Sequence, residues 1–368
     1  MAITVFSQTF KRELDIEQIL SLRGHDCRLD INTRIKNLSN EEKGEIYNDV
    51  ICPICRSQGG KIVLASTSKQ AHFRFDTHNY FCDYNNSKDN KSQKGKLVDF
   101  GSDRSHETKI IRELVAKGIE QEIISQHLIS EMRKYFYDTK IDNQYKMDVS
   151  VDAFKWWMKL TFLQPLSLTT IHHIKFNPIY AQLPNFNWKL AAESLFIQEN
   201  INLIEIANNC DWRITQKIYD KTIRTIQDTQ SSIVFYVTKL HIPYQNTITL
   251  AHFIANNLFI KDSKKGNYLI SSDIVLALAA LLLYIADWDI EAAILKLIKI
   301  VESPAPNDIN SGNVIGLNPF YDFEVWAIIA KVREVSNYST NGFDYKAHIE
   351  AIETRLKSEY ELWKSLHK

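Results

Sequence analysis

The feature that most constrains this chain is Cys52-Pro-Ile-Cys55, which is followed downstream by further histidine and cysteine side chains. Two cysteines separated by two residues form a tight turn that aims both sulfurs inward, which supplies half of a tetrahedral zinc site. The other half must come from downstream, where His72, His78 and Cys82 are the candidates. The pattern therefore predicts a zinc-binding module.

The residues between the two halves have the composition of a β-hairpin. Gly59-Gly60 is typical of a turn, and the β-rich residues 61–67 and 71–75 lie on either side of a polar bend. A cysteine turn, two strands and a second ligand pair are together the outline of a zinc ribbon.

Two choices for the closing ligands stay open. His78 and Cys82 are separated by three residues, a usual spacing for the second pair of a structural site, and we favour them. His72 leads a strand in which Phe73 and Phe75 alternate with it, so it could point at the metal or order the site through a hydrogen bond. The predicted ligands are Cys52, Cys55, His78 and Cys82, with His72 as the alternate.

Composition limits the class of protein. The 368 residues include 44 basic and 44 acidic side chains, so any contact with nucleic acid must come from a local patch. Of the five cysteines three lie in this one stretch, which argues against disulfides, and Cys27 and Cys210 are isolated. Charged residues interrupt the start of the chain, and the longest apolar run, residues 274–286, is too short for a bilayer. We expect a cytoplasmic protein without membrane contact.

The N-terminal motifs resemble those of a known family. The Cys-Pro-x-Cys turn, the hairpin, His-Phe-Arg-Phe at residues 72–75 and the distal Cys-Asp-Tyr are similar to the zinc-finger region of competence protein CoiA-like proteins. Ser105-His106-Glu107-Thr-Lys109 is similar to the helix start that follows that finger. The resemblance covers about residues 50–130 and implies work on DNA, because a nuclease domain often follows the finger in that family. The family's commoner form is His-Phe-x-His, and Phe75 at the fourth place shifts the last ligand toward His78 or Cys82.

The sequence divides into a β-containing N-terminal part and a helical remainder. Residues 1–102 hold the zinc-ribbon module, residues 103–150 a connecting helix and linker, and residues 151–368 an α-helical domain. The predicted fold class is therefore mainly α (α+β), with a small N-terminal zinc-ribbon β module followed by a larger all-helical domain.

Apolar residues at helical spacing predict one long helix over residues 106–136, weakened at Gly118. Residues 276–283 are apolar all round, so we expect their helix to be central to its domain. Further helices are predicted over residues 152–162, 188–198, 203–209, 214–226, 273–286, 290–302, 321–335 and 345–366. Strands are predicted over residues 27–31, 97–100 and 232–240, and the lysine-rich residues 85–96 are expected to be a solvated loop rather than a phosphate-contacting arm.

Residues 202–226 have the outline of a helix-turn-helix. Ala207 would permit a close helix crossing, Trp212 would fill the turn, and Ile214 would anchor the second helix. The usual glycine of the turn is missing, so we favour an ordinary pair of packed helices. If the segment does bind nucleic acid, residues 232–240 could form the strand of a wing. Its phosphate contacts would then come from Arg213, Lys217, Lys221 and Arg224.

A metal-dependent nuclease site is the alternative that the resemblance invites. Asp99 with Glu107 and Lys109 supplies the residue types that hold Mg²⁺ and orient water. Glu107 begins a helix, however, and Met147-Asp148-Val149, which resembles the aspartate strand of the family's nuclease, is not followed by a second acidic strand. We therefore assign no catalytic residue.

Binding rather than catalysis is the preferred interpretation. We expect a zinc-containing nucleic-acid-binding protein, with DNA preferred and a structural Zn²⁺ that stabilises a module too small to fold on its core alone. Two alternatives stay open. One is a competence-type metal-dependent nuclease in DNA processing or phage defence. The other is a helical interaction subunit that docks a partner enzyme.

Overall fold

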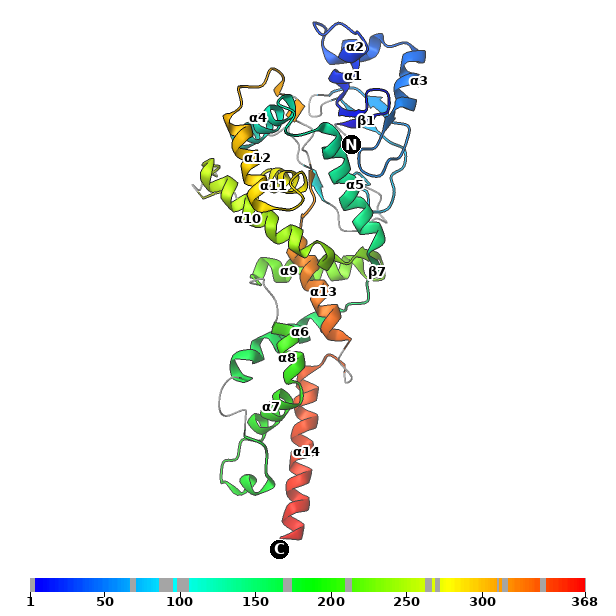
Figure 1. The fold of residues 1–368 in the computed structure, drawn as a ribbon. Coiled ribbons are helices and arrows are strands. Elements are labelled where there is room, and N and C mark those ends of the chain that lie inside the picture. Colours follow the sequence, from blue (N-terminus) through cyan, green and yellow to red (C-terminus); the bar gives the residue numbers. More distant parts are fainter. Residues whose placement is uncertain are drawn as a thin grey trace. The chain divides into compact units, whose positions relative to one another are not determined.

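A computed structural model describes residues 4–66, 71–85, 95–97, 106–167, 174–208, 214–261, 267–268, 272–309, 311–312, 317–337 and 342–367. Helices dominate this part of the chain, and most of its short strands precede residue 98 (Figure 1). The predicted fold class, mainly α with a small N-terminal β module, is confirmed. No helix within the described ranges combines the length and apolar composition that a bilayer span requires.

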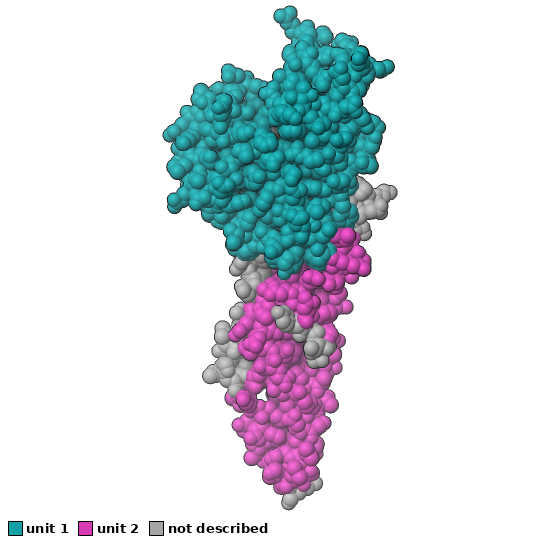
Figure 2. Space-filling model, turned by 45° about the vertical axis from the view of Figure 1, so that its right-hand side comes forward, with its two compact units in different colours: residues 1–145, 234–323 teal, residues 146–233, 324–368 magenta. Residues whose placement is uncertain are grey.

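The chain divides into two compact units, each made of two separate segments of the sequence (Figure 2). The first unit comprises residues 1–145 and 234–323, and the second comprises residues 146–233 and 324–368. The N-terminal residues therefore share a unit with helices from the second half of the sequence.

A three-stranded antiparallel sheet opens the first unit, with the strands in the order β2–β1–β3. β1 (Val5–Ser7) pairs with β2 (Arg12–Leu14) on one side and with β3 (Val50–Ile51) on the other. Helices α1 (Ile16–Leu22), α2 (Ile31–Asn37) and α3 (Asn40–Asp49) connect β2 to β3.

The strand predicted over residues 27–31 is wrong. Asp30 has extended backbone angles, and its carboxylate accepts hydrogen bonds from the backbone N–H groups of Asn32 and Thr33, so it caps α2. Because an aspartate in this position satisfies backbone donors that a strand would leave to a partner, the local sequence favours a helix start.

The predicted hairpin is confirmed, but its two strands are shorter than the predicted residues 61–67 and 71–75. β4 (Lys61–Val63) and β5 (His72–Arg74) pair antiparallel, with Lys61 opposite Arg74 and Val63 opposite His72. Gly59, just before β4, has φ +84°, a conformation that favours glycine, and a Cβ there would lie 2.6 Å from the Tyr47 hydroxyl oxygen. The turn therefore requires glycine both for its backbone angle and for space.

Helix α11 (Asp273–Tyr284) is the core of the helical part of the first unit. It packs against α4 (His106–Glu120), α5 (Gln126–Asp142), α10 (His241–Asn257) and α12 (Ile290–Glu302). All its residues from 274 to 283 are buried, as expected for a helix that is apolar all round.

The single helix predicted over residues 106–136 is wrong, because two helices, α4 and α5, occupy this range. The backbone N–H of Ile124 donates to the carbonyl of Gly118, and the chain reverses before Ser125 caps α5. A Cβ on Gly118 would lie 2.6 Å from Ile124 Cδ1. Gly118 thus provides the space into which the returning chain packs.

The strand predicted over residues 232–240 is shorter than expected. Only β8 (Ile233–Phe235) is extended, pairing with β7 (Gln144–Lys146), and a 3₁₀ turn (Val237–Leu240) leads directly into α10. Pro243 lies in the first turn of α10, where a missing backbone N–H breaks no hydrogen bond, so it does not prevent the helix. β7 also ends before residues 147–149, the segment compared above with a nuclease strand.

The second unit is built of helices. α6 (Val151–Ser167) packs against α8 (Ile201–Asn208) and α9 (Gln216–Thr229), and α14 (Tyr345–Leu366) packs along α7 (Trp188–Glu199). The remaining elements are a 3₁₀ helix (Pro178–Gln182), α13 (Phe323–Ser336) and, in the first unit, β6 (Lys96–Leu97) paired with β9 (Leu317–Asn318). The eight helices predicted individually from residue 152 onward are all present.

Candidate metal centre

Cys52 and Cys55 lie on a tight turn that follows β3. The backbone N–H of Cys52 donates to the Ser57 carbonyl at 2.8 Å, and the N–H of Arg56 donates to the Cys52 carbonyl at 3.1 Å. Arg56 has φ 61°, in the left-handed region, which reverses the chain immediately after Cys55. Both cysteine side chains are thereby buried.

The second pair lies after β5. Cys82 N–H donates to the Asn79 carbonyl at 3.1 Å, and the side-chain amide of Asn85 donates to the carbonyls of His78 and Asn79. The two halves are also joined, since the Asn79 side-chain amide donates to the Cys55 carbonyl at 3.4 Å. A local network of hydrogen bonds, most of them from asparagine side chains to backbone carbonyls, thus fixes the His78–Cys82 segment against the cysteine turn.

The structure brings Cys52, Cys55, His78 and Cys82 into one cluster, in which one ligand atom from each lies within 4.8 Å of the others. The Sγ atoms of Cys52 and Cys82 are 3.8 Å apart, and His78 Nδ1 is 3.5 Å from both Cys55 Sγ and Cys82 Sγ. All three cysteines are free thiols, because a disulfide would require sulfurs about 2 Å apart. The cluster could therefore hold a metal ion.

The imidazole of His78 is oriented by aromatic neighbours. Its ring centroid lies 5.3 Å from that of Phe75 and 5.9 Å from that of Tyr84, and both of these residues are buried. These contacts hold Nδ1 toward the thiols. Phe75 thus supports the histidine that enters the cluster.

His72 is placed differently. It lies in β5 opposite Val63 and is buried, and it does not belong to the four-residue cluster. Of the two closing pairs considered from the sequence, the structure thus gathers His78 with Cys82.

Burial and mutual hydrogen bonding shift the pKa values of the three thiols in opposite directions. Burial raises the pKa of the Cys52 thiol to about 12, and a hydrogen bond with Cys52 raises the pKa of Cys82. Hydrogen bonds with Cys52 and Cys82 lower the pKa of Cys55. Because cysteine binds a metal ion as the thiolate, metal binding to this cluster would release protons.

Two buried ion pairs connect α5 to the residues around the cluster. Arg133 pairs with Glu13 of β2, which also accepts a hydrogen bond from Thr4. About two turns further along the same face of the helix, Lys140 Nζ lies 3.1 Å from Asp83 Oδ1, and Asp83 directly follows Cys82. All four charged side chains are at least nine-tenths buried. No sequence motif indicated these residues.

The predicted nucleic-acid contacts lie in the second unit. Lys217 and Arg224 are exposed on α9, and Lys221 is half-buried on the same helix. Arg213, Trp212 and the rest of the predicted turn fall outside the described residues.

The nuclease alternative is only partly covered by the described residues. Asp99 lies outside them, Glu107 and Lys109 lie in α4, and Asp148 forms an ion pair with Arg333 at 3.0 Å. Residues 86–94 of the lysine-rich loop and residues 98–100 of a predicted strand also lie outside.

The ligand assignment is tested by comparing two histidine variants. We expect His78→Ala to weaken metal binding as much as Cys82→Ser does, because each removes one of four donors. His72→Ala should weaken binding by only about 10- to 100-fold, as changes beside a metal site do. Competition with a chromophoric chelator measures all three affinities. The opposite order, with binding lost in His72→Ala and intact in His78→Ala, would make His72 the ligand.

Comparisons with protein-family models, with curated proteins and with solved structures find no match to this chain.

Proposed function

We propose that the cluster binds one Zn²⁺ ion. For a tetrahedral site with Zn–S about 2.3 Å and Zn–N about 2.0 Å, the sulfurs lie about 3.8 Å apart, and sulfur and nitrogen about 3.5 Å. The distances between Cys52 and Cys82 and from His78 to its two neighbouring thiols have these values. Three thiolates and one imidazole in tetrahedral arrangement favour zinc over the hard cations Mg²⁺ and Ca²⁺.

The zinc in this proposal is structural rather than catalytic. Four protein side chains complete a tetrahedral shell, which leaves no position for water or substrate. Cys52, Cys55 and Cys82 are part of the hydrophobic core that also contains Val5, Phe73 and other buried residues. A metal enclosed in this way stabilises the fold, and elemental analysis of the purified chain should find about one zinc per molecule.

We propose further that the chain binds nucleic acid, with DNA preferred, through α9. Lys217, Lys221 and Arg224 follow one another at intervals of four and three residues and so form one stripe on the helix. The buried residues of α9, Thr222, Ile226 and Thr229, lie on its opposite side. This cationic stripe on the outer side of a packed helix is the observation that carries the proposal.

The N-terminal end of α9 adds to the attraction for phosphate. Thr215 caps the helix, and Lys217 lies in its first turn, where the helix dipole favours an anion. The carboxylate of Asp220 accepts a hydrogen bond from the Gln216 side chain at 2.9 Å. The stripe ends at Asp228, so its positive charge is concentrated in the first two and a half turns.

Charge reversal on α9 tests this function. We expect Lys217→Glu with Lys221→Glu to weaken binding to unrelated DNA sequences and to flatten the dependence of log K on log salt by about one unit per lost phosphate contact. Fluorescence anisotropy at several salt concentrations measures both quantities.

A matched control is available on α14, where Lys346 and Lys364 are exposed. Lys346→Glu with Lys364→Glu changes the net charge equally and should reduce DNA binding much less. If the two double variants bind DNA alike, or if a folded α9 variant binds as the wild type does, α9 is not the interface.

A further inference from the structure

A pocket of about 530 Å³ lies within the second unit, and we call it the α7 pocket. One wall is a face of α7, and the other comes from the 3₁₀ helix and the residues on either side of it. The volume falls within the range of small-molecule sites. The described lining contains no residue of α9 or of the metal cluster, so neither proposal above accounts for this pocket.

The wall that α7 supplies is long and mainly apolar. Its members, which recur at helical spacing, are Leu190, Ala191, Ser194, Leu195 and Gln198. The Ser194 hydroxyl donates to the Leu190 carbonyl at 2.8 Å, and the Gln198 side-chain amide donates to the Ile174 carbonyl at 3.3 Å. From its first to its last member this wall runs about 12 Å along the helix axis, a length that suits an extended chain.

Aromatic contacts hold the opposite wall in place. Phe176 and Phe186 both line the pocket, and their ring centroids lie 5.9 Å apart. Phe186 packs edge-on against Trp188 at 4.9 Å, and Trp188 in turn contacts Tyr360 of α14 at 5.8 Å. The 3₁₀ helix also packs against α14. The pocket is therefore part of the fold and needs no ligand to form.

Three large apolar side chains of the lining are exposed to water. Ile174, Tyr180 and Leu183 have exposed fractions of 58%, 42% and 63%. A ligand with an apolar body would remove part of this surface from water, which is the dominant driving force for such binding.

Lys175 gives the α7 pocket a positive charge. Among the described lining residues it is the one charged side chain, and a carboxylate is not among them. Its ammonium is exposed and forms no ion pair with any residue that the structure describes. A cation in this place attracts an anionic group. Because the ammonium lies in water, that group can stay hydrated while the apolar part of the ligand enters the pocket.

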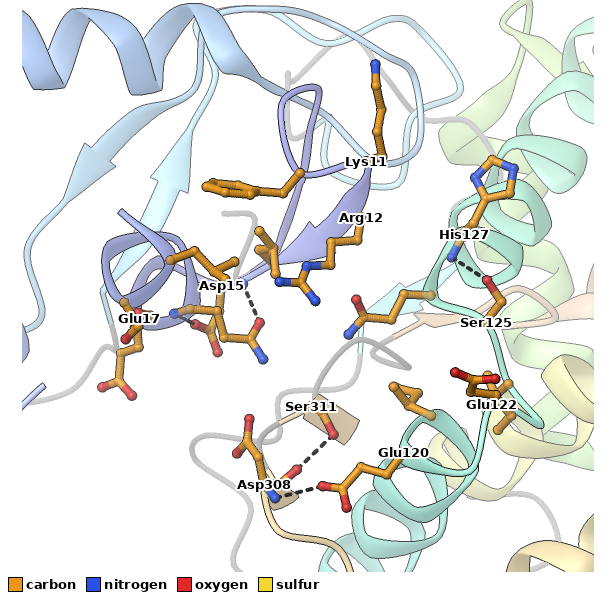
Figure 3. A pocket seen from close by; sticks show the side chains of 18 residues that line it. Lys11, Arg12, Asp15, Glu17, Glu120, Glu122, Ser125, His127, Asp308 and Ser311 are labelled. Atoms are coloured by element: carbon orange, nitrogen blue, oxygen red, sulfur yellow. Dashed lines mark hydrogen bonds between the residues drawn. The ribbon is translucent and has the colours of Figure 1, made fainter. Parts of the chain in front are cut away.

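The larger pocket of the first unit, of about 860 Å³, has a different character (Figure 3). Its lining mixes several carboxylates with Lys11 and Arg12. One of these carboxylates, Glu120, accepts hydrogen bonds from the backbone N–H groups of Asn307 and Asp308 at 2.9 and 2.8 Å. Such a lining favours no single ligand charge, whereas the α7 pocket combines apolar walls with one positive charge.

We propose that the α7 pocket binds a free medium-chain aliphatic carboxylate. The hydrocarbon chain lies along α7 against the rings of Phe176 and Phe186, and the carboxylate stays in water beside Lys175. The length of the α7 wall favours an extended chain over a single ring. The charge of the lining favours an anionic head over a neutral or cationic one.

Calorimetric titration of the full, metal-loaded chain with decanoate tests the proposal, and octanoate and decan-1-ol are the matched probes. Octanoate is shorter by two methylene groups, so it should bind about tenfold more weakly. Lys175→Gln should weaken decanoate binding by up to about fivefold, as expected of an exposed ion pair, and should leave the binding of decan-1-ol unchanged.

Leu183→Glu introduces a carboxylate into the lining and removes an apolar contact, so we expect it to weaken decanoate binding by about tenfold or more and decan-1-ol binding less. Leu362→Glu is the matched control, because Leu362 of α14 has the same exposed fraction of 63% and lies outside the lining. This control should bind both probes as the wild type does. Melting temperature shows whether each variant is folded.

Three results would overturn the proposal. One is absence of decanoate binding to the wild type, and another is equal binding by folded Leu183→Glu. The third is binding to vesicles of anionic phospholipid without binding to free decanoate, which would make the pocket a membrane contact. The zinc and DNA proposals are unaffected by any of them, because those have their own assays.

Discussion

Replacing Cys52 with serine is expected to remove the bound metal and to unfold the part of the chain around it. Structural zinc contributes on the order of 10 kcal/mol to the folding of small modules, which is comparable with the whole stability of a typical domain. The Cys52 side chain is fully buried in the N-terminal core. Among the described residues the cluster contains four ligand residues, so none is left over to replace Cys52. Elemental analysis and hydrogen exchange over residues 4–85 measure the two effects.

Cys27→Ser is the matched control for that experiment. Cys27 is the exposed free cysteine of the same unit, and it lies outside the cluster. The control should keep about one metal ion per chain and wild-type exchange protection. A Cys52→Ser protein that also kept its metal would show that the cluster does not hold it.

The second large effect is expected from the ion pair between α5 and β2. Arg133→Met should lower the free energy of unfolding by about 3–5 kcal/mol, because it leaves the Glu13 carboxylate buried without its cation. Urea denaturation measures the loss. Methionine fills most of the space of the arginine side chain, so a cavity accounts for only a small part of the loss.

Double replacement separates the missing charge from lost packing. Glu13→Gln with Arg133→Met removes both charges and keeps an acceptor for the Thr4 hydroxyl. We expect it to recover most of the stability lost by the single variant. A single variant within about 1 kcal/mol of the wild type would mean that the pair is not buried as described.

Features that depend on neighbouring residues could be predicted from the sequence. Cys52 and Cys55 form one turn, His78 and Cys82 form another, and the hairpin between them follows from its own turn and strand residues. In the second unit, apolar residues recur every three or four positions along α14. In each of these segments the residues that determine the local structure lie within a few positions of one another.

Features that depend on distant residues could not be predicted. Glu13 and Arg133 are 120 residues apart in the sequence, and neither has a neighbour that indicates the pairing. The break between α4 and α5 depends on the fit of Ile124 against Gly118, which a periodic apolar pattern does not reveal.

The ion pair between Lys140 and Asp83 has a consequence for how the chain folds during synthesis. All four cluster residues have left the ribosome once Cys82 has emerged, yet the charge next to Cys82 has no lysine partner until α5 is made. Glu13 likewise has no arginine partner until Arg133 of α5 is made. The nascent chain can gather its thiols early, but two buried carboxylates of the N-terminal region lack their cationic partners until α5 is made. We therefore expect the four cluster residues to be more accessible to a metal ion during this interval than in the folded chain.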